Sequence, residues 1–181
     1  QAAIAQIKKD AKAYLAQDKA MASLKKKEPR AALRHLDEAV ALQPREGSFW
    51  ELRGHAWKMS DKFDNAEKAY TTAIDKNPRY FSPYLARGIL RHERGQKDQG
   101  LIDIKRSYEI LPTSAASFYL GEAALAAKQY EQAASYFQQA QQAGGDLGKK
   151  ASQELIAIQL QLQPLSFLSA TLSYSEQGYL L

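Results

Sequence analysis

The chain of 181 residues contains no cysteine. This absence excludes a disulfide framework and any chemistry that requires a thiolate, and it is compatible with both the cytosol and the periplasm. No apolar run approaches the roughly 20 residues that a membrane-spanning helix needs, so no direct membrane insertion is expected. The sequence also lacks the glycine-rich phosphate loops and the GxSxG motif of common nucleotide-binding and hydrolase sites.

Histidine is scarce, with three copies in the whole chain. His92-Glu93 begins an HExxH zinc motif, but Gln96 occupies the position of the second histidine. Without that ligand one helical turn later, a catalytic zinc site cannot form in this way. His35, His55 and His92 fall in different predicted helices, and each is interpreted as a surface residue. The sequence therefore predicts no metal site and no cofactor.

Charge is mildly positive, with a formal net charge of +5. The densest basic run, 25–27, suits the solvated C-terminal end of a helix. A nucleic-acid footprint would need a longer basic stripe with interleaved aromatic residues, so a nucleic-acid partner is not expected. Carboxylates are grouped in places, but Asp61 and Asp64 are expected to help start a helix. No set of nucleophile, base and acid is visible, and we predict that the chain is not an enzyme.

One sequence motif, however, recurs four times along the chain. A small residue is followed after four positions by a large apolar residue, then by a second small residue and a helix-ending residue. The copies are Ala32-Leu36-Ala39-Pro44, Ala66-Tyr70-Ala73-Pro78, Gly100-Ile104-Ser107-Pro112 and Ala133-Phe137-Ala140-Gly145. Successive copies start 34, 34 and 33 residues apart. A period of this size predicts a stack of helix pairs, in which each unit buries its apolar face against its neighbours.

The motif resembles the tetratricopeptide repeat (TPR), most clearly in residues 47–80. Its first helix has the large, small and aromatic residues Trp50, Gly54 and Trp57, and its second has Phe63, Ala66, Tyr70, Ala73 and Pro78. In the third copy, Arg91 replaces the expected aromatic residue and Gly100 the usual alanine. The resemblance implies an all-α superhelix of four helix-turn-helix repeats. It says little about the ligand, because the residues that match are packing residues.

The expected organisation extends beyond the four repeats at both ends. Residues 1–12 continue the first repeat helix or form a preceding helix, with Ile4, Ile7, Ala11 and Tyr14 on one stripe. The repeats are predicted at 13–46, 47–80, 81–113 and 114–148, followed by a capping helix at 149–163. Residues 168–174 alternate apolar and polar side chains like a strand, which predicts a truncated β-hairpin within 164–181. An apolar tail lying along the array is the alternative.

In this family the first helix of each repeat lines the concave face, so the resemblance implies a partner-binding groove. The aligned groove positions are Tyr14, Gln17, Met21, Leu24, Glu51, His55, Lys58, Leu85, Ile89, His92, Phe118, Glu122 and Leu125. Their mixed apolar and polar character suits an extended segment or a helix. The alternative for Leu85, Ile89, Phe118 and Leu125 is packing between repeats.

One type of ligand is disfavoured by the same alignment. Chaperone-binding members hold a terminal carboxylate with a clamp of basic and amide side chains. The aligned positions here are Gln17, Met21, Leu52, Ser82 and Ala86, so the clamp is missing. Three other basic residues of the first helices, Arg53, Arg87 and Arg91, lie toward the packing side and could form ion pairs between repeats.

These observations predict a non-catalytic scaffold that binds a peptide or protein. Because the chain begins with Gln1, we expect it to be part of a longer or processed protein. The layout is similar to that of periplasmic HExxH zinc metallopeptidases that carry repeats after the protease domain, which implies a bacterial envelope location. The alternatives are a free-standing adaptor in pilus, secretion or outer-membrane assembly, and a cytosolic regulatory module. The oligomeric state is not indicated.

Overall fold

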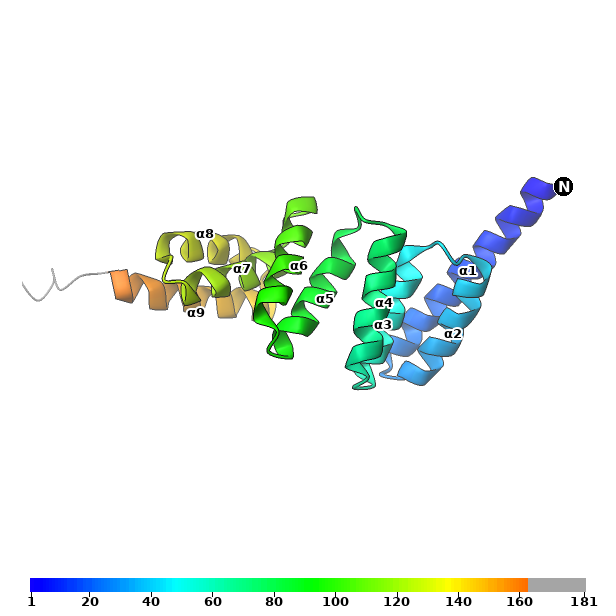
Figure 1. The fold of residues 1–181 in the computed structure, drawn as a ribbon, viewed down its shortest axis with the longest axis horizontal. Coiled ribbons are helices and arrows are strands. Elements are labelled where there is room, and N and C mark those ends of the chain that lie inside the picture. Colours follow the sequence, from blue (N-terminus) through cyan, green and yellow to red (C-terminus); the bar gives the residue numbers. More distant parts are fainter. Residues whose placement is uncertain (163–181) are drawn as a thin grey trace, which may run out of the picture. The chain divides into compact units, whose positions relative to one another are not determined.

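The computed structural model describes residues 1–162, which form nine α-helices and no strand (Figure 1). The chain divides into two compact units, residues 1–112 and 113–181. The first unit contains α1 (Ala2–Lys25), α2 (Pro29–Leu42), α3 (Gly47–Met59), α4 (Phe63–Lys76), α5 (Phe81–Glu93) and α6 (Lys97–Ile110). The second contains α7 (Ser114–Ala126), α8 (Tyr130–Gln141) and α9 (Gly145–Leu162). The predicted β-hairpin at 164–181 lies outside the described residues.

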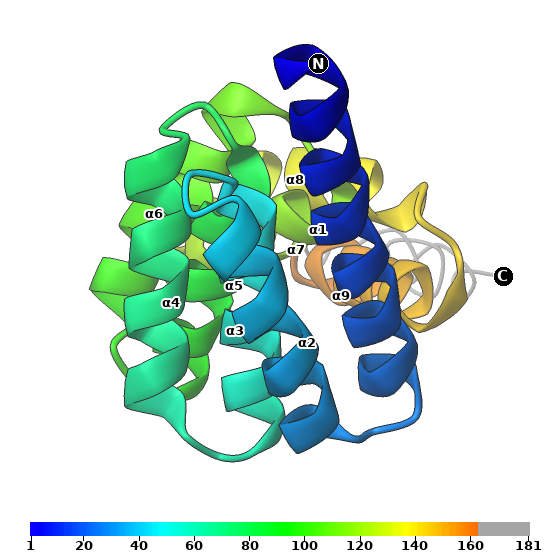
Figure 2. The ribbon, with the colours of Figure 1, turned by 90° about the vertical axis from the view of Figure 1, so that its right-hand side faces the viewer.

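Each predicted repeat contains one pair of helices, α1–α2, α3–α4, α5–α6 and α7–α8, and α9 packs on α8. Residues 2–12 are continuous with the first repeat helix, because α1 runs without a break from Ala2 to Lys25. Figure 2 looks at the end of the first unit, where α1 and α2 lie side by side. No helix within residues 1–162 combines the length and the apolar character needed to cross a bilayer.

The small residues of each repeat allow the two helices of a pair to approach closely. A Cβ added to Gly54 of α3 would lie 2.3 Å from the ring of Tyr70 in α4. In the third repeat the two backbones themselves approach, because a Cβ on Gly100 would lie 2.6 Å from the backbone oxygen of Gly88. The departure from alanine at position 100 therefore has a packing reason.

The turn inside each helix pair ends the first helix with a left-handed residue. These residues are Lys27, Asp61, Gly95 and Lys128, with φ angles of 59°, 56°, 82° and 59°. In each turn the next amide donates to the carbonyl five residues earlier, as Lys62 N does to Trp57 O. This pairing is the Schellman motif, which satisfies the free carbonyls at a helix end.

The expectation that Asp61 helps start a helix is wrong, because its backbone terminates α3 instead. The N-cap of α4 is Lys62, and no side chain caps that helix end. Asp64 does lie in the first turn of α4, where a carboxylate favours the positive end of the helix dipole.

Each unit has its own apolar core. In the first unit, the buried face of α1 presents only small residues to α2, and Leu36 and Phe49 are fully buried beside it. In the second unit, Phe118 and Phe137 pack edge to face with ring centroids 5.7 Å apart, and Ile158 of α9 closes the cluster. The first helices are thereby held in fixed positions relative to their partners.

Candidate protein-binding face and the arginine network

The first helices of the first unit, α1, α3 and α5, contact one another through the side chains of one continuous surface, here called the first-helix face. Between α1 and α3, the Tyr14 ring packs edge to face on Phe49 at 5.7 Å, and Gln17 Nε2 lies 3.4 Å from Ser48 Oγ. Between α3 and α5, Lys58 Nζ lies 2.6 Å from Glu93 Oε2. Tyr14, Gln17 and Lys58 of the predicted groove therefore contact the first helix of a neighbouring repeat.

A buried carboxylate lies within this face. Glu51 of α3 is only 6% exposed and accepts hydrogen bonds from the hydroxyls of Tyr80 and Ser82, at the N-terminal end of α5. His55 Nε2 lies 3.6 Å from Glu51, and its Nδ1 shares a 3.0 Å hydrogen bond with the Tyr70 hydroxyl.

These contacts determine the ionisation of Glu51. Burial alone would raise the pKa of its carboxyl, but the contacts with the three surrounding polar side chains outweigh this effect and lower the pKa. Burial and the neighbouring Glu51 raise the pKa of the Tyr80 hydroxyl, which keeps it a hydrogen-bond donor. Glu51 therefore links the side chains of this face to one another and exposes little of its own surface to a partner.

The other predicted groove residues differ in exposure. Tyr14 is 45% and Met21 37% exposed, so their side chains are accessible. The half-buried ones in the first unit are Gln17, Leu24, His55, Lys58, Leu85, Ile89 and His92. Met59, two helical turns after Glu51, is 43% exposed and adds an apolar side chain that the sequence alignment missed. Its signal was its i,i+4 spacing from His55.

In the second unit, the predicted groove residues lie on α7. Glu122 and Leu125 are half-buried, whereas Phe118 is 9% exposed and packs in the core. Phe118 therefore has the packing role that the sequence left open. The partner-binding groove itself stays a prediction.

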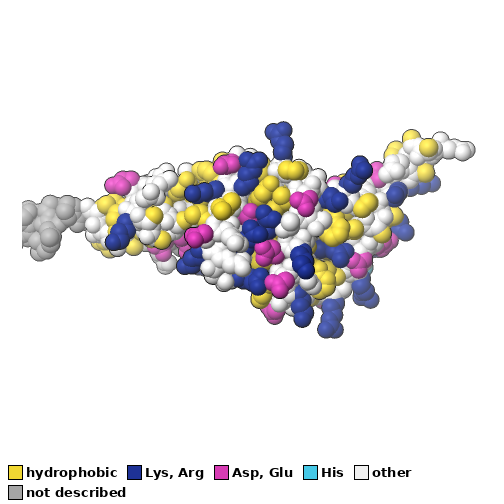
Figure 3. Space-filling view, in the orientation of Figure 1, with side chains coloured by type: hydrophobic (Ala, Val, Ile, Leu, Met, Phe, Trp, Pro, Cys, Tyr) yellow, Lys and Arg dark blue, Asp and Glu magenta, His cyan; other side chains and the backbone are white. Residues whose placement is uncertain are grey.

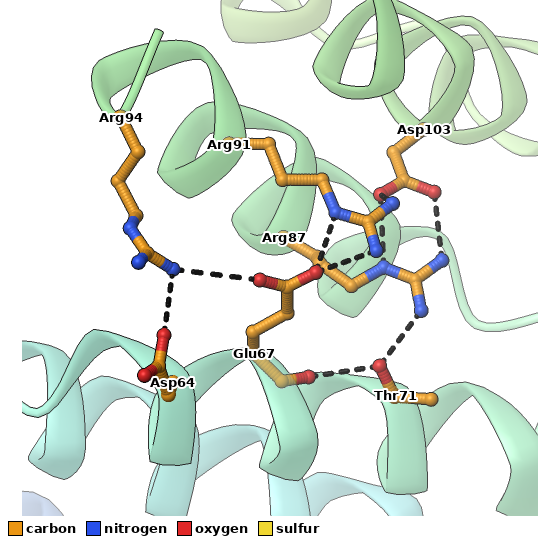
Figure 4. A network of polar contacts seen from close by, with 7 residues as sticks. All are labelled: Asp64, Glu67, Thr71, Arg87, Arg91, Arg94 and Asp103. Carbon is orange, nitrogen blue, oxygen red and sulfur yellow. Dashed lines mark hydrogen bonds and ion pairs between the residues drawn. The ribbon is translucent and has the colours of Figure 1, made fainter. Parts of the chain in front are cut away.

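A second polar cluster joins α4, α5 and α6 (Figure 4). Arg87 of α5 donates from Nε and Nη2 to Asp103 of α6, both at 2.8 Å, and from Nη1 to Thr71 of α4. Arg91 donates to Asp103 at 2.9 Å and to Glu67 of α4 at 2.6 and 2.8 Å.

The edge of the cluster is more exposed. Arg94 lies 3.0 Å from Asp64 and 3.7 Å from Glu67. Asp103 at the centre is only 4% exposed, and a carboxylate so buried needs this kind of pairing.

Ion pairs between repeats, expected from the basic first-helix residues, are confirmed. Arg91 reaches Glu67 of the preceding repeat, and Arg53 of α3 pairs with Asp37 of α2. The Arg53 guanidinium also lies 5.1 Å from the centre of the Trp50 ring. The residue that departs from the repeat pattern, Arg91, thus replaces an apolar contact with a polar link across the α4–α5 boundary.

Within residues 1–162, no group of three or more His, Asp or Glu side chains could hold a metal ion. The carboxylates of the arginine network are bonded by guanidinium groups, and Glu51 is surrounded by donors.

Comparison with known proteins identifies the fold. The family model of the tetratricopeptide repeat matches residues 104–147. The described helices have the tetratricopeptide-repeat fold. The crystal structure of MamA is 21% identical, with a TM-score of 0.62 over 81% of this chain and 85% of that one. The first TPR of Spaghetti (RPAP3) bound to the HSP90 peptide SRMEEVD is 22% identical, with a TM-score of 0.61 over 66% of this chain and 95% of that one.

A curated relative is also similar over part of its length. Anaphase-promoting complex subunit 3 of Schizosaccharomyces pombe is 24% identical over 88 residues, which is 49% of this chain. The matching segment spans 13% of that relative. At these identities the TPR likeness concerns the fold and does not identify a partner.

Proposed function

We propose that this protein is a non-catalytic scaffold whose first-helix face binds a peptide or protein segment. The observation that carries the proposal is the set of accessible apolar side chains on that face: Tyr14, Met21 and Met59 are 37–45% exposed. Methionine adapts its shape readily and is common on surfaces that bind varied apolar groups. A solved structure of similar fold, the first TPR of Spaghetti (RPAP3), is bound to a peptide, which supports the proposal.

The chemistry of the face favours a segment with apolar side chains. The positions of the carboxylate clamp are occupied by Gln17, Met21, Leu52, Ser82 and Ala86, which supply no cation. A terminal carboxylate would therefore find no charged donor there. The methionines and the Tyr14 ring instead offer apolar area, and Gln17 and Ser48 offer hydrogen bonds to a peptide backbone.

A displayed library of random 12-residue peptides tests the proposal directly. Peptides selected on the wild-type chain are titrated against Met21→Glu and Met59→Glu. We expect each variant to weaken binding at least about tenfold, because a charge then lies where apolar contact is made. Amide hydrogen exchange should show peptide-dependent protection in α1, α3 and α5.

The matched control is Ile102→Glu, since Ile102 is an apolar residue with 68% exposure on the second helix α6. Its peptide affinity should equal that of the wild type, and circular dichroism should show unchanged helicity in all three variants. Equal binding by the wild type and both methionine variants would refute the assignment of this face. Zinc-supplemented peptidase assays of the 181-residue chain should show no hydrolysis.

The cellular context is proposed from the layout of the sequence alone. We place the scaffold in the periplasm, as part of a bacterial envelope protein whose upstream region carries an HExxH peptidase domain. A free-standing adaptor in pilus, secretion or outer-membrane assembly is the alternative, and a cytosolic regulatory module is another. Sequencing the complete gene separates them, because an upstream HExxH domain supports the first, a secretory signal alone the second, and neither the third.

A further inference from the structure

The sulfur atoms of this chain belong to two methionines, Met21 and Met59, since cysteine is absent. Met21 of α1 lies one helical turn after Gln17, whose side-chain amide is 3.4 Å from Ser48 Oγ of α3. Met59 lies one turn after His55, at the end of α3. The two methionine side chains are 37% and 43% exposed. Both thioethers are therefore on the first-helix face and accessible to solvent.

Neither methionine belongs to the core of the described residues. Ala20 and Ser23 occupy the buried positions beside Met21, and Ala56 occupies the one beside Met59. The apolar clusters within residues 1–162 include neither methionine side chain. A chemical change at these two sulfur atoms should therefore alter the surface of the first-helix face and leave the packing of the helices intact.

We propose that the first-helix face is a site of reversible methionine oxidation. Hydrogen peroxide converts Met21 and Met59 to sulfoxides, and the modified face binds an apolar segment more weakly. The effect on binding rests on the function proposed for this face, whereas the oxidation itself depends only on the accessibility of the two thioethers.

The reaction needs a peroxide as oxidant and no catalytic group. An electron pair of the thioether sulfur attacks one oxygen of the peroxide, so that an S–O bond forms and the O–O bond breaks. The departing hydroxide takes the proton from the oxygen now bound to sulfur and leaves as water. The sulfur has then lost two electrons and the peroxide has gained them. The product, methionine sulfoxide, can be reduced back to methionine by dedicated reductases.

Other side chains compete poorly for the oxidant. Figure 3 shows Lys and Arg side chains interspersed with Asp and Glu on the face that it draws. At neutral pH the lysine and arginine groups are protonated and have no free electron pair with which to attack peroxide. Trp50 and Trp57 are half-buried, and the chain has no thiol. Mild peroxide should therefore modify the first-helix face before any other part of the surface.

Oxidation makes this face polar at the two points where it offers the most adaptable apolar contact. A sulfoxide carries an oxygen that accepts hydrogen bonds, in place of a soft and polarisable thioether. An apolar segment that covers this oxygen supplies no donor for it, and burial of an unpaired polar group is unfavourable. The face should therefore bind such a segment tightly only while both sulfur atoms are reduced.

Graded treatment of the 181-residue chain with hydrogen peroxide, followed by mass spectrometry of its peptic fragments, tests the modification. We expect one added oxygen on Met21 and one on Met59, with helicity by circular dichroism unchanged. The two classes of methionine sulfoxide reductase, which each act on one sulfoxide epimer, should together remove both oxygens. If either methionine resists peroxide until the chain is unfolded in urea, or if helicity falls as the sulfoxides form, the proposal is wrong.

Titration with a peptide selected on the wild-type chain, after the peroxide has been removed, tests the effect on binding. Oxidation should raise the Kd at least about tenfold, and the reductases should restore it. The control is the double variant Met21→Leu with Met59→Leu, which keeps a similar apolar volume without sulfur and should bind equally before and after peroxide. Equal affinity of the reduced and oxidised wild type, or an equal loss in the leucine variant, would overturn the inference. Failure of the reduced wild type to select any peptide would instead refute the proposed function, and the effect on binding with it.

Discussion

Arg87 and Asp103 form a two-point ion pair, with both N–H···O distances at 2.8 Å and the carboxylate almost fully buried between α5 and α6. Asp103→Asn would leave two guanidinium groups, of Arg87 and Arg91, without their shared countercharge. Removal of one partner from a buried pair is strongly destabilising. We expect the free energy of unfolding of the first unit to fall by about 3 kcal/mol.

Urea unfolding followed by tryptophan fluorescence measures this change, because both tryptophans, Trp50 and Trp57, lie in α3 of the first unit. The control is Glu109→Gln, which alters the pair with Arg106 on the surface of α6. Both of those side chains are about half exposed or more, so the cost should stay below about 1 kcal/mol. Equal effects of the two variants would show that the buried pair is no stronger than a surface one.

Ser107 is fully buried, and its hydroxyl has no hydrogen-bond partner within residues 1–162. The same repeat position holds Ala39, Ala73 and Ala140, each fully buried. Ser107→Ala should therefore stabilise the chain by about 1 kcal/mol, because the unbonded hydroxyl loses its hydration on folding. Thermal unfolding by circular dichroism would show a higher Tm.

A second buried serine provides the matched control. Ser117 is 1% exposed, but its hydroxyl lies 3.1 Å from Gln139 Oε1 and bonds to it. Ser117→Ala should lower the stability of the second unit by about 1 kcal/mol, since it removes the hydrogen bond to Gln139. Opposite signs for the two substitutions are the expected result, and a loss of stability in Ser107→Ala would contradict it.

Glu51 should make the stability of the first unit depend on pH. Its pKa is lower in the folded chain, so its carboxylate stabilises the fold above the unfolded value of 4.5, and this contribution disappears as the pH falls through the folded pKa. Glu51→Gln should cost about 2 kcal/mol at pH 7, where it replaces a carboxylate bonded by two hydroxyls. The difference from the wild type should shrink as the pH falls below 4.5.

Urea titrations at pH 7, 5 and 3 provide the measurement. Glu109→Gln, whose carboxylate is 64% exposed, should show no comparable change with pH. A pH-independent cost of Glu51→Gln would mean that the uncharged amide loses only packing, and that the carboxylate charge contributes nothing.

The spacing of the repeated residues was sufficient to predict the fold, because these residues are small or apolar for reasons of packing. Gly54 has to be small where the Tyr70 ring approaches, and the same requirement recurs at Gly88 and Gly121. The turns that end the first helices were harder to predict, although the second residue after each of these helices has a left-handed backbone. Glycine occurs in only one of the four turns, so the residue type alone could not locate them.

The polar clusters were harder to predict because their partners lie in different repeats. Glu51 aligns with an outward position, and its burial depends on Tyr80 and Ser82, about one repeat later. Asp103 occupies a second-helix position whose importance depends on the arginines at 87 and 91. Departure from the repeat pattern at Arg91 was the one local signal, and it indicated an ion pair without identifying the carboxylates.

Two neighbouring lysines in the turn between α1 and α2 allow backbone strain to be tested by itself. Lys27 has φ of 59°, whereas Lys26 has φ of −81°, and both side chains are exposed. Glycine adopts the left-handed conformation without the steric cost that other residues bear, so Lys27→Gly should stabilise the first unit by about 0.5–1 kcal/mol. Lys26→Gly removes the same charge at a backbone that lysine adopts without strain, and it should stabilise nothing or cost a few tenths of a kcal/mol. Urea midpoints measured by tryptophan fluorescence distinguish the two, and the equivalent exchange Gly95→Ala in the third repeat should be destabilising. Equal midpoints for both lysine variants would show that the turn carries no strain.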